Sequence, residues 1–148
     1  MSSLTLAQAS TILDVALKTG REAKFAPLSV AVLDAGGHLV AFKREDKSGI
    51  LRFEIAFGKA WGALGMGFGS RTLAGRVSRS QMFFTALAAA SEGRFVPVTG
   101  GVLVRDGAGD IIGAVGISGD TSDNDEKCAI AGIAAAGLKA DPGVDPAA

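Results

Sequence analysis

The chain has 148 residues, of which 48% are hydrophobic and 20% charged, and its formal net charge at pH 7 is zero. This length suits a single domain, and the balanced charge predicts no binding to nucleic acid or to an anionic membrane. No apolar run reaches the roughly 18 residues of a membrane span, and the single cysteine excludes an internal disulfide framework and favours a cytoplasmic location.

The N-terminal part of the chain predicts a helix followed by a hairpin. Thr5 and Gln8 form a capping-box pattern, and apolar residues then recur at helical spacing up to about residues 20–24. Residues 28–33 are apolar on both faces and predict a buried strand. Glycines at 36–37 turn the chain into a second strand over 39–44.

The rest of the chain predicts two more helices, a second hairpin and a last helix. The helices are expected at about 51–65 and 80–91, separated by a loop that contains Arg71, Arg76 and Arg79. Glycines over 62–69 disfavour a helix there, so close approach of a helix, a subunit or a ligand is expected. A strand over 111–117 and a small apolar helix body over 128–138 follow. Residues 141–148 are expected to be a loose tail after a single domain over 1–140.

A short sequence motif occurs twice and predicts the architecture. Residues 34–41 (DAGGHLVA) and 106–113 (DGAGDIIG) each place an Asp- and Gly-containing turn between apolar runs, as in a β-hairpin. Two hairpins joined through helices predict an α+β layered fold, with one antiparallel sheet of four to five strands covered by helices. The only histidine, His38, follows the first turn, where the second hairpin has Asp110.

Five segments together resemble the GlcG/HbpS family, which includes the C-terminal domain of PduO-type proteins. They are residues 30–44, 56–60, 100–102, 112–119 and 125–132. The resemblance covers about residues 4–137 and implies a profilin-like fold, homo-oligomers and, in some members, binding of haem or corrinoid-related ligands. The chain departs from the family pattern at Leu103, where members often have proline. It also departs at Trp61, where they often have threonine and where a bulky ring would reshape a nearby pocket.

The candidate ligand-binding residues each have two interpretations. His38 is a polar turn residue or an iron ligand. Arg44 and Asp46 belong to a solvated loop or to the Arg-x-Asp pattern that the resemblance implies. Lys59 lies on an apolar helical face, so it either pairs with a carboxylate across the fold or joins Arg52 or Arg44 in holding an anion such as a propionate.

These residues lead to a binding hypothesis and to one without a ligand. In the first, the chain is a cytoplasmic homo-oligomer that holds haem or another tetrapyrrole. His38 would be the axial ligand, and Arg44, Arg52 or Lys59 would meet the propionates. In the other, the domain is a structural oligomer with no ligand, which the glycine-rich end of the second predicted helix would suit.

An enzyme is the remaining hypothesis. Its substrate would be a small carboxylate or an aromatic metabolite, held between the second predicted helix and the sheet or at a subunit boundary. Lys59 and Arg44 would bind the anion, next to Trp61, and Glu54 or His38 would move a proton. Glu54 is either a surface acid favoured by the helix start or, if it is buried, a general base.

Overall fold

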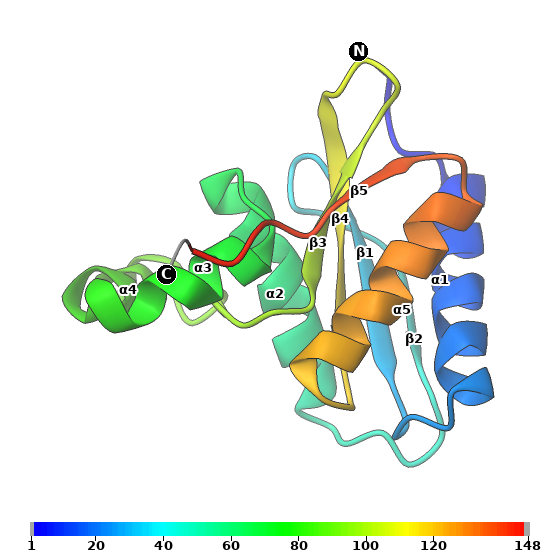
Figure 1. Cartoon of the computed structure of the whole chain (residues 1–148), viewed down its shortest axis with the longest axis horizontal. Coiled ribbons are helices and arrows are strands. Elements are labelled where there is room, and N and C mark those ends of the chain that lie inside the picture. Colours follow the sequence, from blue (N-terminus) through cyan, green and yellow to red (C-terminus); the bar gives the residue numbers. More distant parts are fainter. Residues whose placement is uncertain (1, 147–148) are drawn as a thin grey trace.

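The computed structural model describes residues 2–146 and contains one five-stranded sheet (Figure 1). Its strands are β1 (Ser29–Asp34), β2 (Leu39–Arg44), β3 (Gly101–Arg105), β4 (Ile111–Ser118) and β5 (Lys139–Asp141), in the order β2-β1-β4-β3-β5. All neighbouring strands are antiparallel. The helices are α1 (Leu6–Glu22), α2 (Arg52–Met66), α3 (Ser70–Arg76), the 3-10 helix η1 (Val77–Arg79), α4 (Gln81–Ala90) and α5 (Ser122–Ala135).

The helices cover both faces of the sheet, so the predicted α+β layered class is confirmed. Helices α1 and α5 lie side by side on one face, and α2 crosses the other (Figure 1). None of the helices within residues 2–146 is long and apolar enough to span a membrane.

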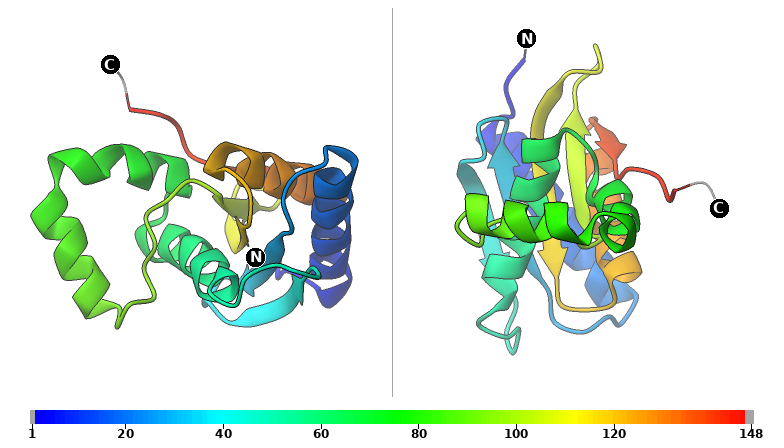
Figure 2. Two further views of the ribbon diagram at one scale, coloured as in Figure 1. Left: turned by 90° about the horizontal axis from the view of Figure 1, so that it is seen from below. Right: turned by 90° about the vertical axis from the view of Figure 1, so that its left-hand side faces the viewer.

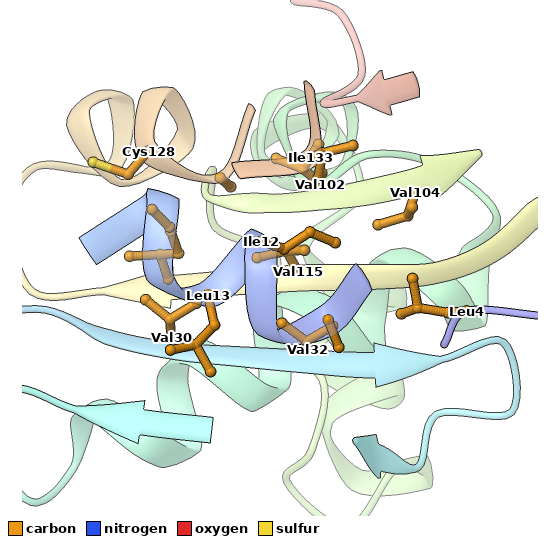
Figure 3. Close-up of a cluster of buried hydrophobic side chains, with 14 of the residues drawn as sticks. Leu4, Ile12, Leu13, Val30, Val32, Val102, Val104, Val115, Cys128 and Ile133 are labelled. Atoms are coloured by element: carbon orange, nitrogen blue, oxygen red, sulfur yellow. The ribbon is translucent and has the colours of Figure 1, made fainter. Parts of the chain in front are cut away.

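The larger core fills the space between the sheet and the α1/α5 pair (Figure 3). Because side chains alternate along a strand, Val30 and Val32 point toward these helices, whereas Leu33 points to α2. Ile12 of α1 and Ile133 of α5 are completely buried here. Helix α1 begins at the predicted capping box, in which Thr5 and Gln8 exchange both hydrogen bonds.

The interface between α2 and the sheet has no space for a ligand where the two backbones meet. A Cβ atom on Gly116 of β4 would lie 1.8 Å from the carbonyl oxygen of Ala56, and one on Gly101 of β3 would lie 2.3 Å from that of Lys59. Glycine is therefore needed at both strand positions so that α2 can lie directly on the sheet. At these two positions no pocket can lie between α2 and the sheet, so a pocket between them has to lie beside these contacts.

The structure differs from the sequence expectation between the second and third predicted helices. Residues expected to form a loop instead form α3 and η1, and together with α4 they extend away from the sheet (Figure 2). The segment after β5 lies against α3. Thr72 exchanges hydrogen bonds with the backbone of Val144, and Arg71 contacts Asp145. The expected loose tail, as far as the structure describes it, therefore makes specific contacts with α3.

Candidate functional site

The two hairpin turns have the same backbone geometry. In the first, Asp34 Oδ1 accepts hydrogen bonds from the backbone N–H groups of Gly36 and His38 at 2.9 and 3.0 Å. In the second, Asp106 Oδ1 accepts from the backbone of Ala108 and Asp110, both at 3.0 Å. Each turn ends on a glycine with positive φ and is followed by a register shift in the strand pair. The aspartate at the start of each copy of the repeated motif therefore stabilises the turn.

The first turn adds an interaction that the second lacks, because its polar residue is a histidine. His38 Nδ1 lies 3.1 Å from Oδ1 and 3.3 Å from Oδ2 of Asp34. A carboxylate only accepts hydrogen bonds, so Nδ1 carries a proton, and in the neutral ring Nε2 then presents a lone pair. Nε2 has no hydrogen-bond partner within residues 2–146, and the His38 side chain is 79% exposed.

The carboxylate of Asp34 is held in its ionised form. Burial raises its pKa, but hydrogen bonds from the backbone of His38 and Gly36 outweigh this and keep the pKa below its ordinary value of 3.8. Metal-binding histidines commonly donate their second ring N–H to a carboxylate, which fixes the ring orientation and the tautomer. The Asp34–His38 pair has this arrangement.

Trp61 of α2 lies against the same turn. A Cβ atom on Gly37 would be 3.0 Å from Cδ1 of Trp61, so the turn and the indole are in contact. The guanidinium of Arg94 stacks on the indole at 4.5 Å from a ring centroid. Trp61 thus joins the hairpin that carries His38 to the loop that carries Arg94.

Three shallow hollows follow the outer side of α2. One of about 140 Å³ lies between Trp61 and residues 35–37, and another of about 180 Å³ lies between Trp61, Leu87 and Phe95. A third, of about 300 Å³, is mainly apolar and is lined by Phe53, Glu54, Phe57, Glu92, Gly93 and Arg94. Glu54 is exposed at this hollow and so lacks the burial on which its expected role as a general base depends.

Lys59 lies away from these hollows, in a buried ion pair. Its Nζ donates to the carbonyl oxygen of Ile117 at 2.8 Å and to Oδ2 of Asp125 at 3.2 Å, and the two charged side chains are 3% and 1% exposed. Burial lowers the pKa of Lys59 and raises that of Asp125, while the attraction between them opposes both shifts. The pair connects α2 to α5 on opposite faces of the sheet.

Arg44 and Arg52 lie at the opposite end of β2 from His38. Arg44 ends β2 and pairs in register with Ser29, whose other neighbour is Ser118, and Arg52 Nη1 donates to Ser118 Oγ at 3.0 Å. Six residues of extended strand put Arg44 about 20 Å from His38. Arg44 and Asp46 line a separate polar hollow of about 380 Å³ with Arg21, Pro27 and Glu45.

The structure therefore brings together only part of the expected set. His38 and Trp61 adjoin through the first turn, whereas Lys59, Arg44 and Arg52 lie elsewhere. Asp34 and Arg94 join His38 and Trp61 and were not singled out from the sequence. The Asp-Ala-Gly-Gly-His spacing could have indicated Asp34, because the turn returns the fifth residue to the first. No sequence signal connects Arg94 to Trp61, since they are 33 residues apart (94 − 61).

Comparisons with known proteins agree with this fold and with the resemblance seen in the sequence. The family model "Haem degrading protein HbpS-like" matches residues 4–134. No curated protein matches the chain significantly.

Several solved structures share the fold over nearly the whole chain. A PduOC–haem complex is 25% identical, with a TM-score of 0.83 over 93% of this chain and 97% of that chain. Klebsiella pneumoniae protein ORFY is 26% identical, with a TM-score of 0.84 over 93% and 92% of the two chains. HbpS is 26% identical, with a TM-score of 0.77 over 90% of each chain.

Proposed function

Because the chain belongs to the HbpS-like family, we propose that it binds a small ligand, haem or another tetrapyrrole, and that His38 would hold the iron. The observation that carries the proposal is the Asp34–His38 pair, which leaves the lone pair of Nε2 free for a metal. A structural neighbour over 93% of the chain is a haem complex, which supports the ligand class.

The surface around Trp61 fits the other parts of a tetrapyrrole. A porphyrin has a flat apolar face and peripheral carboxylates. The indole of Trp61 and the rings of Phe53 and Phe57 offer aromatic contacts along α2. Arg94, which lines the 300 Å³ hollow, is the cation placed to meet a carboxylate. When bound, haem supplies a redox-active iron that can take small axial ligands.

The role of the remaining basic residues is assigned by distance. Arg44 and Arg52 lie at the far end of β2 and could reach a carboxylate only on a ligand bound there, beside the 380 Å³ hollow. Lys59 is occupied by Asp125 and Ile117 inside the fold. In the proposed site, Arg94 therefore has the propionate-binding role that was expected of those three.

Assembly is part of the same proposal. The hollows along α2 are shallow and His38 is largely exposed, so a single copy covers only part of a tetrapyrrole, whereas ligand pockets usually bury most of their ligand. We therefore propose a homo-oligomer in which a second copy helps to cover the ligand, as the family resemblance implies. A cytoplasmic location stays a prediction from the single cysteine, which is buried and not in a disulfide.

Titration with haemin tests the axial ligand. We expect the wild type to bind one haem per chain and to show the Soret band of a histidine-ligated haem. His38→Ala should lose this spectrum and bind more weakly. Asp110→Ala, at the matching position of the second hairpin, should behave like the wild type. An unchanged Soret band and affinity in His38→Ala would refute the assignment.

A further inference from the structure

Helix α4 is an apolar helix with little cover from its own chain. Only Phe84 and Leu87 of its ten residues are not exposed, and they pack toward Leu73 and Phe95 in a small satellite core. The helix carries no charged residue. It lies at the end of the segment that extends from the sheet (Figures 1 and 2). Gln81 and Thr85 are its only polar residues, and a helix whose exposed surface is mostly apolar normally has a partner.

The outer side of α4 is complementary to itself when two copies run antiparallel. Its N-terminal half carries the bulky side chains of Met82 and Phe83, which are 87% and 50% exposed, and its C-terminal half carries exposed alanines. Met82, Ala86 and Ala89 are spaced to share the side opposite Phe84. In an antiparallel pair centred near Ala86, Met82 of each copy lies over Ala89 of the other, so a large side chain meets a small one.

Charges at the two ends favour the same arrangement. Arg79 lies just before α4 and Glu92 just after it; both are exposed, and neither forms an ion pair within residues 2–146. An antiparallel pair brings the Arg79 end of one copy to the Glu92 end of the other. Antiparallel packing also aligns the helix dipoles favourably. A membrane-surface helix would instead carry basic residues on a polar face, which α4 lacks.

We propose that α4 is the surface through which two copies of this chain associate, as an antiparallel α4–α4 pair with two-fold symmetry. The pairing deepens the homo-oligomer part of the proposed function and rests on it. A ten-residue helix is only about 15 Å long and provides less than the roughly 800 Å² per subunit of a standard interface. The contact therefore has to include exposed residues next to α4, such as Arg79 and Glu92 at its two ends.

Native mass spectrometry and light scattering of three proteins test the surface. We expect the wild type to be a dimer or a multiple of one, and Met82→Glu to halve the mass of the assembly. Ile50→Glu, at a residue that is 85% exposed but distant in sequence from α4, should keep the wild-type mass. Circular dichroism shows that each variant is folded. A folded Met82→Glu protein with the wild-type mass would overturn the pairing while leaving the homo-oligomer intact, whereas a monomeric wild type would overturn both.

Crosslinking tests the antiparallel register without a disruptive charge. The native Cys128 is buried, so Ala86→Cys provides the one accessible thiol. Near the two-fold axis it should join two chains through a short bismaleimide linker in high yield. Ile50→Cys should give little crosslinked dimer. Equal yields for the two variants would contradict an α4 pair centred near Ala86, and haem titration of Met82→Glu reports separately whether ligand binding survives.

Discussion

Replacing Lys59 with methionine should unfold the protein more readily, because it leaves a buried carboxylate without its counter-ion. Asp125 is 1% exposed and would retain one hydrogen bond, from the backbone of Asp120 at 3.0 Å. Removing one partner of a buried pair costs about 3–5 kcal/mol. In a domain of this size each kcal/mol lowers Tm by roughly 2–4 °C, so Lys59→Met should lower Tm by about 10 °C.

A second substitution should restore much of the lost stability. Lys59→Met with Asp125→Asn removes both charges and keeps an acceptor for Asp120, and replacing a buried pair by neutral groups is often nearly neutral. Lys43→Met is the matched control, since Lys43 pairs with Asp14 on the surface at 60% and 61% exposure, and it should cost less than about 1 kcal/mol. Urea unfolding measures all three. A cost below about 1 kcal/mol for Lys59→Met, or a double variant no more stable than the single, would refute a buried structural pair.

Three further outcomes follow from local geometry. Gly116→Ala should destabilise the fold by several kcal/mol, on the order of 4, because its Cβ would clash with the carbonyl oxygen of Ala56, whereas Gly107→Ala, with open space, should be nearly neutral in thermal melts. Burial raises the pKa of Cys128 to about 11, so its thiol should resist maleimide at pH 8 until urea unfolds the protein; rapid labelling of the native state would contradict this. Hydrogen bonds from the backbone of Ala26 and other donors lower the pKa of Asp120 below 3.8. These hydrogen bonds therefore stabilise the fold above pH 3.8, where the carboxylate is ionised, and the stabilisation is lost in stronger acid. In urea melts, Asp120→Asn should be less stable than the wild type at pH 7 and equal to it in strong acid.

Locally encoded parts of the fold could be predicted from the sequence. The hairpins were predictable because an aspartate and a glycine at fixed spacing determine the turn, and α1 because its cap lies within four residues. Helix α3 was missed, since its short sequence, with arginine and glycine near both ends, has no apolar periodicity. Its position depends on contacts with Val144 and Asp145 about 70 residues away.

The site was less predictable because it depends on distances through space. The sequence left open whether Lys59 binds an anion or pairs across the fold, and its partner Asp125 is 66 residues away. His38 and Arg44 were grouped although a strand separates them. The rise of an extended strand, about 3.4 Å per residue, already places them about 20 Å apart. Trp61 was included in the expected ligand site because it departs from the family pattern, and the structure gives it contacts with the first turn and with Arg94.

The central claim is that a tetrapyrrole binds where the first hairpin meets Trp61, with Nε2 of His38 on the iron. A crystal structure of the protein loaded with haem tests this most directly. We expect iron bonded to Nε2 of His38 while Nδ1 keeps its hydrogen bond to Asp34, and a porphyrin face against Trp61. Iron bonded to another residue, or a porphyrin bound beside Arg44 at the far end of β2, would contradict the proposed site.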